Sequence, residues 1–184
     1  MTRSLIFGGT RSGKSAYAER LAIASGNEVL YVATAHAGDG EMAARIALHR
    51  ARRPPAWRTL EEGAALGQVI ATHSGPHCVV LIDCLTIWLS NLLFSQEQAF
   101  AEIGQIAPPD CVAVQRAHLL ASLAQARGDV ILVSNEIGMG VVPQGALSRW
   151  FVDAAGELNQ AVAAVCDHVV LVAAGLPLTL KGAA

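Results

Sequence analysis

The feature that most constrains this chain is a glycine-rich octapeptide close to its start. Residues 8–15 read Gly-Gly-Thr-Arg-Ser-Gly-Lys-Ser and match the pattern G-x-x-x-x-G-K-[ST]. A short apolar run precedes the octapeptide and an Ala- and Leu-rich stretch follows it, which is the strand, loop and helix context that a phosphate-binding loop requires. Glycines let successive backbone N–H groups face one anion at the positive end of the following helix. The motif therefore predicts a nucleotide site after the first strand.

Two residues at the end of the octapeptide have expected chemical roles. Lys14 is expected to reach the β- and γ-phosphates of a nucleoside triphosphate, and Ser15 to ligate Mg²⁺. The structural alternative is a glycine-rich turn that Ser12 or Ser15 merely caps, and the combined motif and context disfavour it.

The rest of the chain alternates short β-branched runs with helical stretches. This alternation predicts the α/β class, with a mostly parallel sheet flanked by helices and buried on both faces. Strands are expected near residues 5–7, 29–33, 79–82, 130–134 and 169–173, and helices over 14–24, 40–52, 61–72, 85–94, 112–126 and 145–165. Residues 95–110 contain Pro108-Pro109 and are expected to form a surface connection or a flap.

Composition limits what the chain can be. Its 184 residues fit one domain over residues 1–184, since a domain averages about 150 residues. Apolar residues make up 53% and charged residues 15%, which excludes a disordered chain. The net charge of -2 gives no reason to expect nucleic acid. We expect no membrane span, because no apolar run approaches the roughly 18 residues that a span needs. The four cysteines lack metal-ligand spacing and no export signal precedes them, so we expect reduced thiols in the cytoplasm.

Polar side chains follow two of the expected strands. Asp83 ends the apolar run 79–82 and is a candidate to hold Mg²⁺ together with Ser15; the alternative is a cap for the helix that begins near Leu85. The pair Asn135-Glu136 follows the next strand and is a second polar group at the same edge, with ordinary capping as the alternative. The Asn-Lys-x-Asp signature of the signalling GTPases is absent, which disfavours a GTPase switch.

A single histidine lies in an arginine-rich segment. Four arginines occur within the nine residues 45–53, and helical spacing would put Arg45 and Arg52 on one face with His49. Cationic neighbours disfavour protonation of an imidazole, and a neutral imidazole can attack phosphorus while arginines hold the phosphates. The alternative is a solvated basic helix end, in which His49 only caps the last carbonyls. The remaining histidines show no metal-ligand spacing, so a zinc site is not expected.

A series of motifs along the chain resembles one known family. The series comprises the octapeptide, Tyr31-Val32-Ala33-Thr34-Ala35, residues 41–46, His49-Arg50 with Arg53-Pro54, Trp57-Arg58-Thr59, Asp83-Cys84-Leu85-Thr86 with Asn91-Leu92-Leu93, and residues 134–143. The chain is therefore similar to the bifunctional adenosylcobinamide kinase and adenosylcobinamide-phosphate guanylyltransferase family of cobalamin biosynthesis. The similarity spans nearly the whole chain and is weakest over residues 95–129.

The resemblance implies a RecA-like P-loop domain, a homotrimer and two reactions at one nucleotide site. A nucleoside triphosphate, ATP or GTP, phosphorylates adenosylcobinamide; GTP then gives its GMP, through a guanylylated histidine, to adenosylcobinamide phosphate. Carried over by position, His49 is the nucleophile. The implied nucleotide contacts are Gly8, Gly9, Thr10, Arg11, Ser12, Gly13, Lys14, Ser15, Ala33, Thr34, Ala35, Arg50, Ala51, Arg52, Arg53, Glu62 and Asp83. One position departs from the pattern: Leu48 stands where family members often carry a second histidine.

Two other functions remain open from the residues alone. The first is a P-loop kinase that phosphorylates another small alcohol, in which His49 only binds phosphate. The second is a nucleotide-gated binding protein or nucleic-acid motor that uses the arginines on a polynucleotide.

Overall fold

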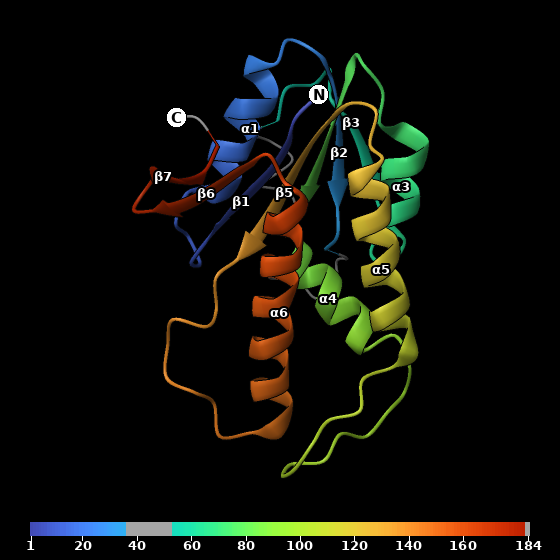
Figure 1. Cartoon of the computed structure of the whole chain (residues 1–184), viewed down its shortest axis with the longest axis vertical. Coiled ribbons are helices and arrows are strands. Elements are labelled where there is room, and N and C mark those ends of the chain that lie inside the picture. The colour runs from blue at the N-terminus through green and yellow to red at the C-terminus, as the bar shows by residue number, and fades with distance from the viewer. Residues whose placement is uncertain (36–52, 183–184) are drawn as a thin grey trace.

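The fold is built on one central sheet (Figure 1). The structure is a computed structural model, and it describes residues 1–35 and 53–182. The strands are β1 (Arg3–Gly8), β2 (Glu28–Ala33), β3 (Arg58–Glu61), β4 (Cys78–Asp83), β5 (Asp129–Asn135), β6 (His168–Ala173) and β7 (Leu176–Lys181). The described helices are α1 (Lys14–Ala24), α3 (Leu66–His73), α4 (Leu85–Leu93), α5 (Asp110–Ala124) and α6 (Ala146–Val165).

The strand order places the candidate residues beside one another. The sheet runs β3-β2-β4-β5-β1-β6-β7, and every neighbouring pair is parallel except β6 and β7. Parallel strands bring their carboxyl ends to one edge, which we call the carboxyl edge. The loop after β1 and the residues that follow β2, β4 and β5 therefore meet there. The irregular segments 94–109 and 136–145 extend beyond this edge in Figure 1.

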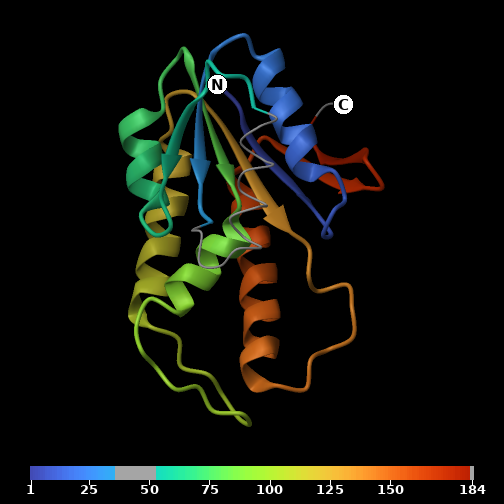
Figure 2. The same ribbon diagram turned by 180° about the vertical axis from the view of Figure 1, so that it is seen from behind.

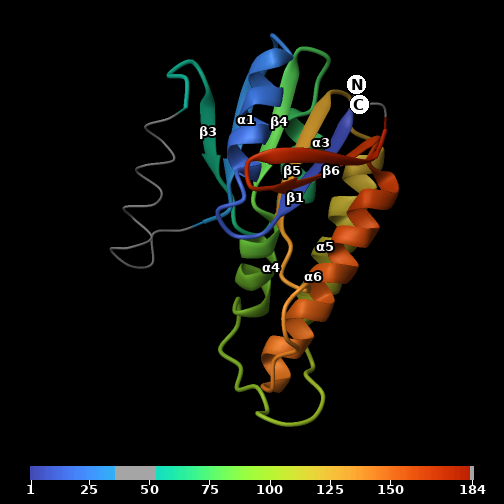
Figure 3. The same cartoon turned by 90° about the vertical axis from the view of Figure 1, so that its left-hand side faces the viewer.

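Helices cover both faces of the sheet and produce two separate cores (Figures 2 and 3). One core packs α3, α4, α5 and α6 against alternate strand residues such as Val80 and Val130. The other packs α1 against the intervening residues, for example Val79 and Ile131. Because successive strand residues are buried on opposite faces, the strands are apolar without alternation, as the sequence predicts.

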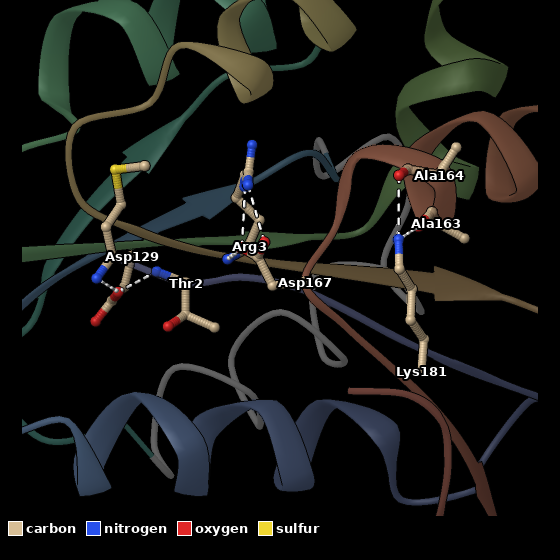
Figure 4. A network of polar contacts seen from close by, with 8 residues as sticks. Thr2, Arg3, Asp129, Ala163, Ala164, Asp167 and Lys181 are labelled. Carbon is tan, nitrogen blue, oxygen red and sulfur yellow. Dashed lines mark hydrogen bonds and ion pairs between the residues drawn. The ribbon is translucent and has the colours of Figure 1, made fainter. Parts of the chain in front are cut away.

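A network of polar contacts holds the opposite, amino edge of the sheet (Figure 4). The Arg3 backbone N–H and Nε donate to Asp167 Oδ2 at 2.8 and 3.0 Å, and Nη2 donates to Oδ1 at 2.8 Å. The Thr2 backbone N–H donates to Asp129 Oδ1 at 2.7 Å. Hydrogen bonds from Arg3 lower the pKa of Asp167 to about 2, and the same pairing raises the pKa of Arg3. Lys181 Nζ donates to the Ala163 and Ala164 carbonyl oxygens at the end of α6, at 2.9 and 3.1 Å.

The predicted α/β class, with its mostly parallel sheet, is confirmed, and five predicted strands are found. The helix predicted over 61–72 is wrong at its start, because β3 occupies Arg58–Glu61 and α3 begins only at Leu66. Two strands were not predicted, β3 and β7, and both lie at the margins of the sheet. Marginal strands are exposed, so they lack the continuous apolar runs that revealed the central strands. The helix predicted over 40–52 lies outside the described residues. Within the described residues, no helix is both long and apolar enough to cross a membrane.

Candidate nucleotide-binding site

Two glycines let the octapeptide curl tightly after β1. Gly13 has a φ of 95°, in the left-handed region that favours glycine, and a Cβ there would come within 3.1 Å of the Gly175 Cα. A Cβ at Gly8 would collide with the Val172 carbonyl oxygen. The loop must therefore pack directly against the end of β6 and the β6–β7 turn, and side chains at either glycine would push it away.

Backbone hydrogen bonds fix the loop on two sides, from the β6–β7 turn and from the residue that follows β5. The Gly175 N–H donates to the Ser12 carbonyl oxygen at 2.8 Å, and the Glu136 N–H donates to the Gly8 carbonyl oxygen at 3.0 Å. Within the loop, the Ser12 N–H donates to the Gly9 carbonyl oxygen at 3.2 Å. The Ser12 hydroxyl oxygen is buried and has no hydrogen-bond partner within residues 1–35 and 53–182. A buried hydroxyl without a partner is costly, so a ligand oxygen in this loop would relieve it.

Lys14 is the cation of the loop. It begins α1, its side chain is buried, and Nζ donates to the Gly9 carbonyl oxygen at 3.1 Å. Burial lowers the pKa of Lys14, and the negative charge of Asp83 acts in the opposite direction. A desolvated ammonium group with one carbonyl partner in the described part of the chain favours a bound anion, which would add both charge and acceptors.

Asp83 ends β4 on the same face of the sheet as α1. Its Oδ2 accepts a hydrogen bond from the Tyr31 hydroxyl at 3.0 Å. Burial, and next the charge of Asp83, raise the pKa of Tyr31 well above its usual range, so the hydroxyl remains a donor. The alternative interpretation of Asp83 as the cap of α4 is not observed, because Cys84 holds the N-cap position and no side chain of the described residues caps that helix.

Thr34 joins the end of β2 to the start of α4. Its hydroxyl accepts from the Cys84 N–H at 2.7 Å and donates to the Cys84 carbonyl oxygen at 2.8 Å. Asn91 Nδ2 donates to the Thr34 carbonyl oxygen at 2.8 Å. The Thr34 side chain thus holds the scaffold of the carboxyl edge together, while its contact with nucleotide remains a prediction.

Glu62 caps the turn that leads into α3. Its Oε1 accepts from the Ala64 and Ala65 N–H groups at 2.8 and 2.9 Å. The Glu62 N–H itself donates to the Ala33 carbonyl oxygen at 3.0 Å, which ties this turn to the end of β2. The predicted nucleotide contacts at Ala33 and Glu62 are therefore neighbours at the carboxyl edge.

Asn135 lies directly beside the phosphate-binding loop, paired in register with Gly8. Its backbone N–H donates to Thr86 Oγ1 at 2.9 Å, and its carbonyl oxygen accepts from Asn159 Nδ2 at 3.2 Å. Neither Thr86 nor Asn159 was singled out from the sequence as a site residue. Nothing in the sequence distinguishes Asn159 from the other polar residues of 145–165, and only its burial in the structure shows that its amide needs polar partners.

The arginine-rich segment is described only at its end. His49, Arg50, Ala51 and Arg52 lie outside the described residues, so their roles stay predictions. The Arg53 Cζ lies 3.3 Å from the centroid of the Tyr31 ring, a cation–π contact. Arg53 Nε and Nη1 are buried and have no hydrogen-bond partner among the described residues. The end of this segment is therefore held close to Asp83, through Tyr31.

Comparison with known proteins identifies one family over almost the full chain. The model of the family described as "Cobinamide kinase / cobinamide phosphate guanyltransferase" matches residues 4–180. The bifunctional adenosylcobalamin biosynthesis protein CobP of Pseudomonas aeruginosa is 52% identical over 180 residues, covering 98% of each chain. CobU of Escherichia coli, which carries the same bifunctional description, is 41% identical over 179 residues, covering 96% of this chain and 98% of the relative. These matches confirm the resemblance seen in the sequence motifs.

Solved structures of remote sequence share the fold. A prototypical ATPase of a bacterial type III secretion system superposes with a TM-score of 0.55 at 12% identity, over 97% of this chain and 56% of the ATPase chain. The assembled ATPase EscN of enteropathogenic E. coli gives a TM-score of 0.52 at 12% identity, over 94% of this chain and 43% of the other. These structures support the predicted RecA-like P-loop architecture and carry no information about the reaction.

Proposed function

Because the chain belongs to the cobinamide kinase and cobinamide phosphate guanyltransferase family, we propose that it catalyses both reactions on adenosylcobinamide. In the first, a nucleoside triphosphate phosphorylates the aminopropanol hydroxyl. In the second, GTP donates GMP to the resulting phosphate and yields adenosylcobinamide-GDP. The observation that carries the proposal is the convergence of the phosphate-binding loop, Lys14 and Asp83 at the carboxyl edge.

The loop supplies the binding and neutralisation that phosphoryl transfer needs. Its backbone N–H groups and the N-terminal end of α1 favour a polyphosphate, and Lys14 would exchange its bond to the Gly9 carbonyl for phosphate oxygens. Since Lys14 is buried, its charge acts on the transferring group with little screening by water. The substrate hydroxyl attacks the γ-phosphorus, its proton leaves to solvent or a nearby base, and the nucleoside diphosphate departs.

The guanylyl transfer uses a different phosphorus atom and a covalent intermediate. We assign His49 as the nucleophile: a neutral imidazole nitrogen attacks the α-phosphorus of GTP, a P–N bond forms, and the bond to pyrophosphate breaks. The phosphate of adenosylcobinamide phosphate then attacks the same phosphorus and releases the imidazole. Arg53 and its predicted companions Arg50 and Arg52 would hold the phosphates during both steps.

Ser15 and Asp83 are the residues that would hold Mg²⁺. The fit rests on the donor chemistry: a hydroxyl in the first turn of α1 and a carboxylate whose Oδ2 is taken by Tyr31, leaving Oδ1 as the oxygen to bind a cation. No cluster of three or more acidic, histidine or cysteine side chains occurs among the described residues, so phosphate oxygens and water would complete the coordination. Bound there, the cation supplies charge neutralisation at the phosphates.

Labelling with GTP that carries radioactive phosphorus at the α-position tests the proposal. We expect an acid-labile protein-bound GMP in the wild type and none in His49→Ala, with much of the kinase activity retained in the variant. His77→Ala, at an exposed position before β4, is the matched control and should label normally. Absence of label in the wild type would instead favour a kinase for another small alcohol. Salt-sensitive binding of polynucleotide would favour a nucleic-acid motor.

We also propose that the protein assembles as a homotrimer. Apolar side chains are exposed in the segment after β5 and on the marginal strand β7, and an interface would remove them from water. They are Met139, Val141 and Val142, and Leu176, Leu178 and Leu180. Light scattering coupled to size-exclusion chromatography should give three times the 19.2 kDa of the chain. A monomeric mass at micromolar concentration would contradict the assembly.

The cytoplasm remains our proposed location. All four cysteines are free, and burial raises the pKa of Cys84 to about 11 and that of Cys166 to about 12, so both stay protonated thiols at neutral pH. Fractionation of cells that express the protein should recover it with the cytoplasmic enzymes.

A further inference from the structure

Tyr31 lies between the two charged parts of the site. It is buried in β2, on the face covered by α1, with 3% of its surface exposed. Its neighbour in β4 is Leu81, and Asp83 follows two residues later, so Tyr31 and Asp83 are diagonal partners on one face of adjacent strands. That geometry lets the Tyr31 hydroxyl reach Asp83 Oδ2 at 3.0 Å.

The ring of Tyr31 makes two further contacts. The Arg53 Cζ lies 3.3 Å from the ring centroid, and the Trp57 ring stacks at 6.4 Å between centroids with an interplanar angle of 25°. A cation over the face of an aromatic ring is stabilised by the ring quadrupole. One tyrosine therefore links the end of the arginine-rich segment to the carboxylate at the end of β4.

We propose that Tyr31 is a positioning residue, whose hydroxyl orients the Asp83 carboxylate for a divalent cation while its ring holds the guanidinium group of Arg53. The inference rests on the cation role that the proposed function gives to Asp83. A carboxylate that accepts one fixed hydrogen bond on Oδ2 keeps Oδ1 in a defined direction. Without the donor the carboxylate can rotate, and cation binding must then also fix its orientation.

A buried tyrosine hydroxyl needs a partner in any case, so the contact alone does not separate positioning from simple packing. The two roles differ in what they do to cation affinity. If the hydroxyl only satisfies its own burial, removing it changes stability and leaves the affinity for a divalent cation unchanged. If it positions Asp83, that affinity falls.

The decisive variant is Tyr31→Phe, which keeps the ring and removes the hydroxyl. Mn²⁺ binding to the full-length protein with GTP, measured by the electron paramagnetic resonance signal of free Mn²⁺, should weaken about tenfold, as expected for loss of one hydrogen bond to a charged group. The Mg²⁺ concentration for half-maximal kinase rate should rise by a similar factor, with a smaller change in kcat at saturating Mg²⁺. Tyr17→Phe is the matched control, since Tyr17 is the only other tyrosine, also lies beside an arginine, and should behave as wild type.

Asp83→Asn separates the inference from the proposed function. If this variant binds Mn²⁺ as the wild type does, Asp83 does not hold the cation. The proposed cation site is then wrong, together with the inference about Tyr31 that rests on it. If Asp83→Asn weakens Mn²⁺ binding and Tyr31→Phe does not, only the inference about Tyr31 is wrong. In the double variant, removal of the Tyr31 hydroxyl should cause no further loss of affinity; independent, additive losses would overturn the coupling.

A measurement on the unsubstituted protein removes any dependence on the folding of a variant. Because the chain has two tyrosines, uniform 3-fluorotyrosine labelling gives two ¹⁹F resonances, which the Tyr17→Phe protein assigns. Adding Mg²⁺ to the GTP complex should shift the Tyr31 resonance more than that of Tyr17. A Tyr31 resonance that does not respond to Mg²⁺ would refute the proposed contact between Tyr31 and the cation site.

Discussion

Each edge of the sheet carries both a cation and a carboxylate, but the two edges differ in how far these charged groups are paired by hydrogen bonds and ion pairs. At the amino edge, the carboxylate of Asp167 accepts three hydrogen bonds from Arg3, and the pKa shifts of both groups favour their charged forms (Figure 4). At the carboxyl edge, Lys14 is buried, its Nζ donates to the Gly9 carbonyl oxygen, and burial lowers its pKa. The Arg3–Asp167 pair at the amino edge is therefore well satisfied, whereas an anion bound beside Lys14 would stabilise the carboxyl edge.

The two lysines of the chain illustrate the same difference. Lys181 remains exposed and donates to two carbonyl oxygens at the end of α6, where a cation complements the helix dipole. Lys14 begins a helix, where the dipole opposes a positive charge, and it is desolvated. A cation kept in an unfavourable position is a sign of ligand binding rather than of a structural role. Substitutions at the two edges should therefore separate activity from stability.

The largest effect is expected from Lys14→Ala. Both activities should fall by about 10²- to 10³-fold, the loss typical of one donor to developing negative charge. The midpoint of thermal unfolding without nucleotide should remain within a few degrees of the wild type, because the lost cation contributes little to stability. Initial rates of both reactions and a thermal scan measure this. A large fall in stability with kcat preserved would reverse the contrast between the edges.

Asp83→Asn should lower the kinase and guanylyltransferase rates by roughly 10²-fold, mainly because the divalent cation binds more weakly. Excess Mg²⁺ should recover part of the rate. The matched control is Asp129→Asn, the same change at the amino edge, where the carboxylate accepts from the Thr2 N–H and lies 3.5 Å from the N-terminal ammonium. That control should lose stability and keep kcat within about twofold. Equal rates in Asp83→Asn and Asp129→Asn would contradict the functional difference between the carboxyl and amino edges.

Asp167→Asn should destabilise the protein without affecting either rate. At pH 7 the loss in free energy of unfolding should be about 1 kcal/mol, since the Asp167 side chain is 40% exposed and solvent screens the ion pair. The pKa of Asp167 is lowered from 3.8 to about 2 in the folded state, so the carboxylate stabilises the fold fully above pH 4. This contribution is lost as the pH falls from about 4 to about 2. Urea unfolding at pH 7 and pH 3 should show a smaller difference between wild type and variant at the lower pH.

The smallest effect is expected from Lys181→Ala. Loss of the two hydrogen bonds to the end of α6 should lower the free energy of unfolding by about 0.5 kcal/mol, as for other cations at helix C-termini. Kinase and guanylyltransferase rates should match the wild type. A rate loss comparable to that of Lys14→Ala would show that the two lysines are not divided between structure and chemistry.

The central strands could be predicted because they are continuous apolar runs, which are typical of strands buried on both faces of a sheet. Most helices could be predicted from the Ala- and Leu-rich stretches between these runs. Val79–Ile82 and Val130–Val133 are continuous apolar segments, and their positions were predicted almost to the residue. β3 and β7 were missed for the opposite reason. β3 is short and largely exposed, and β7 is exposed along its length, so neither has a burial pattern in the sequence.

The site divides in a similar way. The octapeptide could be singled out because its motif places glycines, Lys14 and Ser15 in consecutive residues, and Asp83 because it ends an apolar run. Their contacts with nucleotide and cation stay predictions. The contacts of Tyr31 with Asp83 and Arg53 join three segments, from β2, from β4 and from the chain before β3. No spacing of residues along the sequence predicts these contacts.

The sequence by itself determined the family and the class of fold, and it located the glycine-rich loop whose phosphate binding stays a prediction, because each depends on motifs or on periodic burial within short stretches. Only the tertiary structure decided that Asp83 is held by a tyrosine rather than used as a helix cap, and that Thr34 and Glu62 hold the edge together. The physical reason is the parallel sheet: its strand order brings residues about 50 positions apart within hydrogen-bond distance. That order is fixed by packing between segments rather than by any one of them.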